Sequence, residues 1–209
     1  MISDRTILND DAESVALIDD IIRSALEGVF EDLRRFDWYI REREIVNLFA
    51  FGHMVPLFSD HRLDLSMMGV EFPVLQIDAS ETSRHGAPKD FVIWSEAHTT
   101  LWKECTLSCG MDLKQLRGPG KKPFAIVEWK NVSRISNRES ANKTRREHVE
   151  NIKWLQSNLW GGMLTIDYAV LTTWRKTSEI SLRCYRVSRD SEGEFLNLPA
   201  ALSHKTSAG

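Results

Sequence analysis

The sequence predicts an α/β protein in which a mixed sheet of four to five strands is flanked by helices and preceded by an extra N-terminal helix. Three observations lead to this fold class. Apolar residues recur at helical spacing early in the chain, short runs of strand-forming residues follow, and a second helical stretch precedes the last strands. Because strands lead into a helix and then a further strand, a sheet covered by helices is expected.

Two amphipathic helices are predicted at the start of the chain. Residues 12–35 carry an apolar stripe at helical spacing, formed by Val15, Ile18, Ile21, Ile22, Leu26, Val29, Phe30 and Leu33. A second helix is predicted over 39–53, and Pro56 is expected to help end it. The apolar stripe of the first helix can either cover the sheet or form the seam of a homodimer.

Five strands and one further helix are predicted after these helices. The strands cover 70–77, 90–94, 124–130, 166–174 and 180–187. A helix over 139–158 follows the third strand, and Gly161-Gly162 closes it. The stretch 96–122 is less regular and is expected to hold an inserted loop or an extra strand. From residue 39 the order is therefore helix–strand–strand–strand–helix–strand.

Composition favours a cytoplasmic protein with no membrane span. The 209 residues are enough for one domain with a proper core. No apolar run approaches the roughly 20 residues of a membrane helix, and no secretory signal is expected at the N-terminus. The three cysteines, an odd number, fit a reducing compartment. We expect an N-terminal helical extension over 1–36, the main domain over 37–189 and a loose C-terminal tail over 190–209.

Charge is unevenly distributed along the chain, although the net charge is only −3. Residues 1–44 carry twelve acidic and six basic side chains, whereas residues 112–153 carry eleven basic and five acidic ones. A local basic surface can bind phosphates even on a protein of negative net charge. On charge alone, a solvated charged face explains the pattern about as well.

The strand predicted over 124–130 ends in two charged residues. Side chains alternate between the faces of a strand, so Glu128 and Lys130 share a face with Phe124 and Ile126. A carboxylate and an ammonium thus lie side by side at the C-terminal end of a strand that otherwise reads as buried. This apolar approach distinguishes the triplet from the many E-x-K triplets of surface strands.

A second carboxylate, Asp90, begins the strand predicted over 90–94. If this strand pairs antiparallel with the next one, Asp90 approaches Glu128. Adjacent carboxylates repel unless they share a cation or a proton, and oxygen ligands suit Mg²⁺. The main-chain carbonyl of Trp129 is a candidate third ligand. Asp78 is a competing partner for Glu128, because thirty-seven residues separate Asp90 from Glu128.

The segments Pro88-Lys89-Asp90 and Glu128-Trp129-Lys130 together resemble the PD-(D/E)xK nuclease superfamily. The resemblance covers roughly two thirds of the chain, includes the order of helices and strands, and implies a restriction-endonuclease-like core. Glu42-Arg43-Glu44-Ile45-Val46 is similar to the E-R-E-L-[IV] start of archaeal Holliday junction resolvases in that superfamily. By this match Glu42 is the functional acid of the first core helix, with Glu44 as the alternative.

The resemblance implies a metal-dependent nuclease that acts on nucleic acid, with DNA as the expected substrate. Asp90, Glu128 and the Trp129 carbonyl would hold Mg²⁺, with Mn²⁺ as a substitute. Lys130 would assist the attacking water, and Glu42 would hold a second metal or a metal-bound water. Basic residues after the E-W-K strand would contact phosphates of the backbone, namely Arg134, Arg138, Lys143, Arg145 and Arg146.

Other interpretations of the same sequence stay open. The chain could keep the nuclease fold as a catalytically inactive protein that binds nucleic acid or a partner. His148 is expected to be an ordinary, partly exposed histidine, although its helix sometimes donates an active-site residue in the superfamily. Cys105 and Cys109 are expected to be free thiols, because C-x3-C without a second ligand pair is not a zinc pattern. Trp94, Trp129 and Trp174 are predicted to pack in the core.

Overall fold

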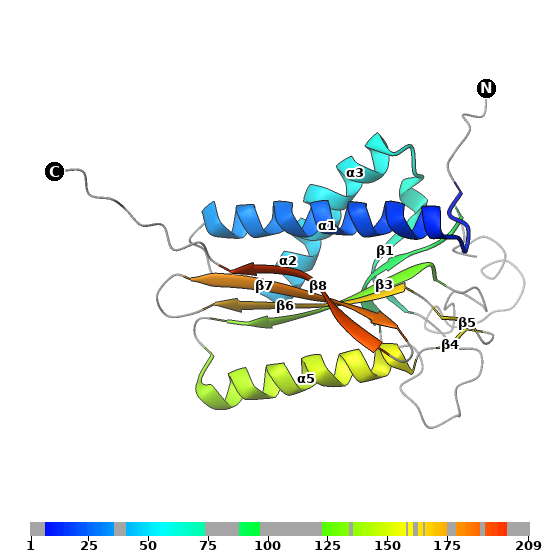
Figure 1. The fold of residues 1–209 in the computed structure, drawn as a ribbon. Coiled ribbons are helices and arrows are strands. Elements are labelled where there is room, and N and C mark those ends of the chain that lie inside the picture. Colours follow the sequence, from blue (N-terminus) through cyan, green and yellow to red (C-terminus); the bar gives the residue numbers. More distant parts are fainter. Residues whose placement is uncertain are drawn as a thin grey trace, which may run out of the picture.

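The protein has an α/β fold in which one mixed sheet carries helices on both faces (Figure 1). The structure is a computed structural model, and it describes residues 7–35, 41–73, 88–96, 123–133, 136–157, 159–160, 163–164, 166–174, 179–188 and 191–199. The expected fold class is therefore confirmed at the level of an α/β protein with a mixed, helix-flanked sheet. In the described part of the chain no helix is long and apolar enough to cross a membrane.

The helical segments lie mainly before the sheet in the sequence. They are α1 (Ala12–Arg35), α2 (Glu42–Asn47), the π-helix η1 (Leu48–Met54), α3 (Val55–Asp60), the 3-10 turn η2 (Leu65–Met67) and α5 (Arg138–Gln156). The strands are β1 (Met68–Pro73), β2 (Pro88–Ile93), β3 (Ala125–Val132), β4 (Leu159–Trp160), β5 (Met163–Leu164), β6 (Ile166–Trp174), β7 (Ile180–Ser188) and β8 (Ser191–Pro199).

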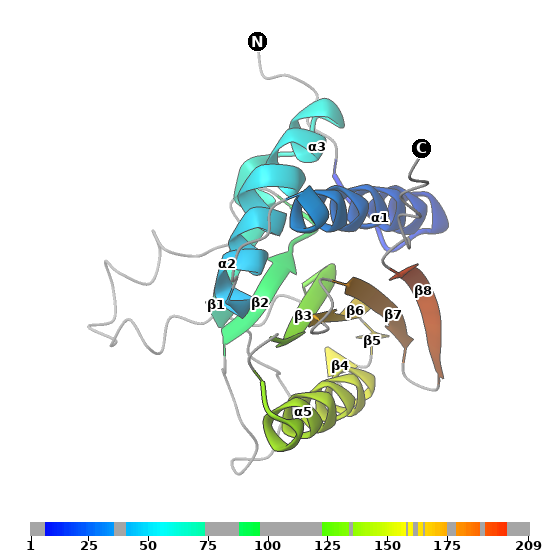
Figure 2. The ribbon, with the colours of Figure 1, turned by 90° about the vertical axis from the view of Figure 1, so that its left-hand side faces the viewer.

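The main sheet has six strands in the order β1-β2-β3-β6-β7-β8. Every neighbouring pair is antiparallel except β3 and β6, which are parallel. Parallel neighbours need a long crossover, and α5 provides it on one face of the sheet (Figure 2). The short strands β4 and β5 form a separate pair. The strands β2 and β3, whose ends carry the candidate residues, are therefore inner strands of the sheet.

Two sequence expectations about element boundaries are wrong. The helical run that was expected to end near Pro56 continues through η1 and α3 to Asp60. Pro56 lies in the first turn of α3, where a missing backbone amide is tolerated. The expected loose tail over 190–209 is also wrong for Ser191–Pro199, which forms β8 on the edge of the sheet; residue 190 and residues 200–209 lie outside the described part of the chain. This strand makes the sheet larger than the four to five strands expected.

The core consists of two apolar clusters, one on each face of the sheet. The larger cluster joins the buried stripe of α1 to alternate strand residues such as Phe91, Trp129 and Tyr168. The smaller cluster joins α5 to the opposite faces of the same strands, including Val92 and Ile126. The α1 stripe therefore covers the sheet, which was one of its two interpretations. The core positions expected for Trp94, Trp129 and Trp174 are confirmed.

Polar contacts fix α1 against the sheet. The Tyr168 hydroxyl donates to Asp19 Oδ1 at 2.6 Å, and Arg186 Nε lies 3.4 Å from the same oxygen. Arg23 donates to the main-chain carbonyl of Phe195 at 3.0 Å, and its guanidinium stacks 4.4 Å from the centre of that ring. These contacts join α1 to β6, β7 and β8, so the N-terminal helix and the edge strand support each other.

Gly28 allows a close approach between α1 and η1. A Cβ atom at this position would lie 2.3 Å from Nδ1 of His53. The His53 ring cannot easily move aside, because its Nε2 lies 2.9 Å from Asp32 Oδ2 and its backbone belongs to the π-helix. We therefore expect Gly28→Ala to destabilise the protein by about 1–3 kcal/mol, as overpacking does elsewhere.

Gly193→Ala is the matched control for this change. Gly193 lies in β8, and a Cβ atom there would have no heavy atom within 4 Å. Urea unfolding of both variants should show a loss for Gly28→Ala and a change within about 0.5 kcal/mol for Gly193→Ala. Equal midpoints for Gly28→Ala and the unaltered protein would show that His53 and α1 separate without cost.

Candidate active site

Two carboxylates face each other where β2 begins and β3 ends. The strands pair antiparallel with Phe91 opposite Val127, which places Asp90 opposite Glu128. The antiparallel pairing expected from the sequence is therefore confirmed. The N-terminus of α2 and one side of α5 approach the same end of the strands. Four elements from distant parts of the chain thus supply side chains to one place.

Asp90 is held by the backbone of the neighbouring strand. Its Oδ2 accepts a hydrogen bond from the Trp129 amide at 2.6 Å. Burial, and then the negative charge of Glu128, raise the pKa of Asp90 to about 7, although the Trp129 amide and Lys130 act in the opposite direction. The two carboxylates therefore share a site where both are charged only at a cost.

Glu128 is buried, with 7% of its surface exposed, and contacts residues of β2 and α5. Lys89 Nζ lies 3.1 Å from Glu128 Oε1 and forms an ion pair with it. The angles of this contact are not those of a hydrogen bond, so Oε1 accepts none from the described residues. The Asn151 side chain donates to Oε2 at 3.4 Å. Lys89 also lies over the ring of Trp154, 3.3 Å from its centre.

Sequence reasoning missed Lys89 and Asn151 as neighbours of Glu128, and Trp154 as the ring that Lys89 covers. Lys89 looked like a spacer between Pro88 and Asp90, and its place beside a predicted acid was the only local signal. Asn151 and Trp154 are more than twenty residues from Glu128 in the sequence. Only the packing of α5 against the sheet brings them close, so no local pattern could have identified them.

Lys130 and Glu42 form a second ion pair at the same end of β3. Lys130 Nζ lies 2.8 Å from Glu42 Oε1 and also donates to the Trp129 carbonyl at 2.8 Å. The other Glu42 oxygen accepts from the Asn131 amide at 3.0 Å. Burial alone would lower the pKa of Lys130, but the hydrogen bond to Glu42 and the nearby carboxylates outweigh it and raise that pKa. Lys130 is therefore an ammonium at neutral pH.

The structure distinguishes Glu42 from Glu44. Glu42 reaches β3, as described above, whereas Glu44 Oε2 accepts a hydrogen bond from the Arg41 amide at 2.8 Å and so caps its own helix. Glu42 is thus the acid of α2 that joins the candidate site. The neighbouring Arg43 pairs with Glu71 at 2.9 Å, and Glu71 has the unusual φ of 48° in β1.

His148 is buried, which corrects the expectation of a partly exposed side chain. It is 4% exposed and lies on the side of α5 that faces the sheet. Burial, and then the positive charge of Lys130, lower its pKa to about 4. Neither ring nitrogen has a hydrogen-bond partner among the described residues. His148 is therefore a neutral imidazole near Lys130 at physiological pH.

The donor set of this site fits a hard divalent cation. Asp90, Glu128 and the Trp129 carbonyl are oxygen donors, the type that Mg²⁺ prefers. Burial, and then the negative charge of Glu128, raise the pKa of Asp90, and a bound cation would offset both effects. Within the described ranges, however, no three His, Cys, Asp or Glu side chains already form a metal-ligating group. Lys89 lies against Glu128 Oε1, so a metal ion that binds through this oxygen would replace Lys89 there.

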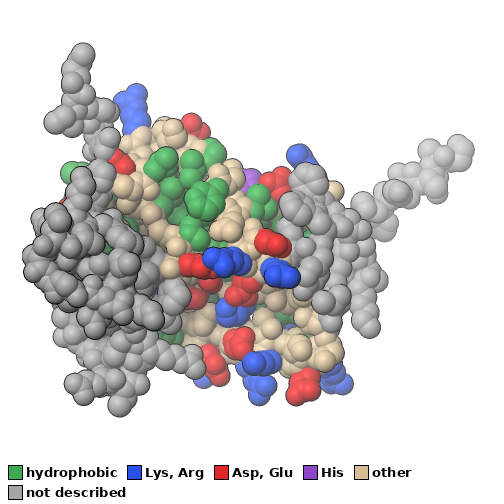
Figure 3. All heavy atoms as spheres, turned by 180° about the vertical axis from the view of Figure 1, so that it is seen from behind, with side chains coloured by type: hydrophobic (Ala, Val, Ile, Leu, Met, Phe, Trp, Pro, Cys, Tyr) green, Lys and Arg blue, Asp and Glu red, His purple; other side chains and the backbone are tan. Residues whose placement is uncertain are grey.

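The described basic residues that were expected to contact phosphates do not form one continuous basic surface. Arg138, Lys143, Arg145 and Arg146 are exposed on α5, while Arg134 lies outside the described residues. Lys143 pairs with Glu147 at 3.8 Å. Arg138 and Arg146 line a shallow depression with Glu139 and Asn142, whereas Arg145 lines a separate cavity between α5 and the sheet. On the face in Figure 3, charged side chains of both signs are likewise interspersed.

Several sequence predictions fall outside the described residues. These are the alternative acid Asp78, the cysteines Cys105 and Cys109 with nearby His98, and nearly all of the inserted stretch 96–122. Their interpretations stay predictions. Cys184, which is described, is a free and buried thiol, and burial raises its pKa.

Comparisons with protein-family models, with curated proteins and with solved structures found no match to this chain. The fold class is established by the α/β architecture and the six-stranded mixed sheet. The resemblance to PD-(D/E)xK nucleases rests on the chain's own residues, above all Asp90, Glu128 and Lys130. A nuclease function for this chain is therefore a proposal.

The raised pKa of Asp90 predicts a distinctive pH dependence of stability. The folded pKa of about 7 exceeds the ordinary value of 3.8. Between these values the folded state binds more protons, so stability falls as pH rises and the loss is complete above about pH 7. Asp90→Asn removes the buried charge. Its unfolding free energy relative to the unaltered protein should therefore improve by about 2 kcal/mol between pH 5 and pH 8.

Urea unfolding in EDTA at several pH values measures this difference. Asp60→Asn, an exposed change at the end of α3, is the control and should show no such trend. A constant difference between Asp90→Asn and the unaltered protein from pH 5 to pH 8 would contradict the electrostatic account of the site.

Proposed function

We propose that this protein is a metal-dependent nuclease that hydrolyses phosphodiester bonds of nucleic acid, with DNA as the expected substrate. The observation that carries the proposal is the juxtaposition of Asp90 and Glu128 across β2 and β3, with Lys130 at the same end of β3. These are the residues through which the chain resembles PD-(D/E)xK nucleases. Their meeting in space supports a shared chemical role.

Asp90, Glu128 and the Trp129 carbonyl are the groups that would hold Mg²⁺ or Mn²⁺, which would polarise the phosphodiester and lower the pKa of a bound water. Asp90 and Glu128 would set the position of that ion at the paired ends of β2 and β3. Asn151, which donates to Glu128, would orient that carboxylate from the side of α5.

Lys130 would stabilise charge instead of removing a proton. Its raised pKa keeps it an ammonium, and an ammonium has donors but no acceptor. It would position the attacking water or stabilise negative charge that develops on the phosphate. Glu42 orients Lys130 through their 2.8 Å contact, so Glu42 would act as a positioning residue unless a second metal binds beside it. The resemblance implies in-line attack and a 5′-phosphate product.

A second candidate function is a catalytically inactive protein that keeps the fold and binds nucleic acid or a partner. One observation favours it: Lys89 pairs with Glu128 and Lys130 pairs with Glu42. These two contacts neutralise most of the buried charge without a metal ion. The two functions therefore differ in whether Lys89 or a divalent cation is the working partner of Glu128.

Cleavage of labelled DNA tests the nuclease proposal. Single-stranded, duplex and branched DNA would be incubated with Mg²⁺, Mn²⁺ or EDTA. We expect metal-dependent cutting that falls by a factor of roughly 10² or more in Asp90→Asn, Glu128→Gln and Lys130→Met. Asp60→Asn should cut as the unaltered protein does. Cutting that survives the three substitutions would place the chemistry elsewhere or in a contaminant.

Substitution of Lys89 tests which partner Glu128 uses. Lys89→Met leaves Glu128 buried without its cation, so the apo protein should lose about 1–3 kcal/mol of stability. If a metal replaces Lys89, millimolar Mg²⁺ at pH 8 should restore stability more in this variant than in the unaltered protein. Thermal unfolding with and without Mg²⁺ measures this, and Glu128→Gln should abolish the response. A destabilised Lys89→Met that ignores Mg²⁺ and Mn²⁺ would favour the inactive alternative.

A further inference from the structure

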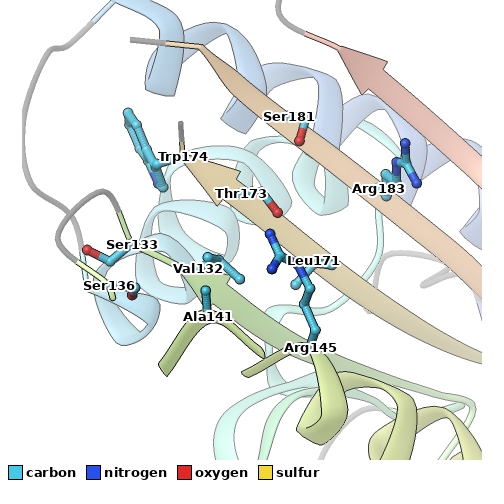
Figure 4. Close-up of a pocket in the computed structure, with 10 residues that line it drawn as sticks. All are labelled: Val132, Ser133, Ser136, Ala141, Arg145, Leu171, Thr173, Trp174, Ser181 and Arg183. Atoms are coloured by element: carbon cyan, nitrogen blue, oxygen red, sulfur yellow. The ribbon is translucent and has the colours of Figure 1, made fainter. Parts of the chain in front are cut away.

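A cavity of about 450 Å³ lies between the first turns of α5 and the sheet (Figure 4). It is lined by Val132 at the end of β3, by Leu171, Thr173 and Trp174 of β6, by Ser181 and Arg183 of β7, and by Ser133, Ser136, Ala141 and Arg145 around the start of α5. The volume is in the range that small-molecule and cofactor sites usually have. The cavity is not used by the chemistry assigned to Asp90 and Glu128.

The lining is suited to an anion. Arg145 reaches from α5 toward the strands, and Arg183 lies across from it on β7 (Figure 4). Ser133, Ser136, Thr173 and Ser181 add hydroxyl groups. None of the described lining residues is acidic. The described contacts of the two arginines include no ion pair; Arg145 makes one long hydrogen bond of 3.4 Å to Asn142.

The N-terminus of α5 adds partial positive charge beside the same cavity. Ser136 and Ala141 line the cavity on either side of the first residue of α5, Arg138. This helix has 19 residues, and the amino end of a helix carries a partial positive charge that favours phosphate. Guanidinium groups, hydroxyl donors and a helix amino end are groups that recognise phosphate oxygens.

The cavity is close to the carboxylate pair along the sheet. Val132 lies four residues beyond Glu128 on the same face of β3, about 13 Å further at the usual rise of a strand. The parallel register places Leu171 beside Lys130 and Thr173 beside Val132. Since successive phosphates of a nucleic-acid strand are separated by about 3.4 Å of helical rise, the offset corresponds to about four nucleotides of a stacked strand.

We propose that this cavity binds a phosphate of the nucleic-acid strand, a few nucleotides from the bond that lies at Asp90 and Glu128, through Arg145 and Arg183. The inference rests on the proposed function for the identity of the ligand as nucleic acid, whereas phosphate recognition follows from the cavity alone. It replaces the expected diffuse basic face by a defined subsite, in which Arg145 contributes and the adjacent Arg146 does not.

Binding in the absence of metal tests the subsite separately from cleavage. A short 5′-fluorescein single-stranded oligonucleotide would be titrated with the full chain in EDTA, and binding followed by fluorescence anisotropy. The double variant Arg145→Gln/Arg183→Gln should bind at least about tenfold more weakly, because charge-assisted hydrogen bonds to a phosphate are lost. The slope of log affinity against log salt should fall in magnitude by about 0.7 for one lost phosphate contact.

Matched single variants locate the effect. Arg146→Gln removes the same charge from the next residue of α5, and Arg34→Gln removes it from α1 on the opposite face of the sheet. Both should weaken binding much less than Arg145→Gln. Circular dichroism and thermal unfolding should be unchanged in all variants, because these arginines are exposed or half-exposed. Equal losses for Arg145→Gln and Arg146→Gln would overturn the subsite.

Inorganic phosphate distinguishes the source of the ligand. Phosphate titrated by calorimetry should bind weakly to the unaltered protein, lose binding in the double variant and compete with the oligonucleotide. Binding of phosphate without any binding of oligonucleotide would overturn the nucleic-acid assignment, and binding of neither probe would overturn the proposal. Oligonucleotide binding that depends on Arg145 and Arg183, in a protein that cuts no substrate with any metal, would refute the nuclease function and support the subsite.

Discussion

The packing of helices and strands around the candidate active site depends on one constraint. Two carboxylates, Asp90 and Glu128, face each other at a largely buried end of the sheet. Burying charge costs several kcal/mol unless partners compensate it. The surrounding elements supply these partners. The Trp129 amide donates to Asp90, Lys89 pairs with Glu128, and Lys130 is held nearby by Glu42 of α2. The amino end of α2 and one side of α5 therefore have to approach the same strand ends.

The compensation is incomplete, and this gives the site its chemical character. Three carboxylates meet two ammonium groups. Burial, and then the negative charge of Glu128, raise the pKa of Asp90 to about 7. A proton, a divalent cation or a rearranged lysine can each remove the excess. Neutral His148, whose pKa is lowered partly by Lys130, shows that the positive charge extends toward α5. Under the proposed function, activity depends on which cation the carboxylates hold, and that choice separates the proposed nuclease from the inactive alternative.

The parallel pairing of β3 with β6 links the carboxylate site to the neighbouring cavity. This pairing requires the α5 crossover, and α5 then contributes Asn151 and His148 near the carboxylates and Arg145 in the cavity. The two regions with proposed functions thus share one strand and one helix. A change in how α5 packs on the sheet would affect both regions, while a change in one arginine would affect the cavity alone. The subsite can therefore be tested without disturbing the carboxylates.

The sequence by itself determined the elements whose periodicity is local. The stripe of α1, the strand β6 and the alternation that puts Glu128 and Lys130 on one face of β3 are all readable because neighbouring residues decide them. The tertiary structure alone decided the choice of Glu42 over Glu44, the pairing of Lys89 with Glu128, the burial of His148 and the addition of β8 to the sheet. Each depends on strand register or on the packing of helices from distant parts of the chain, and local spacing carries no information about such contacts.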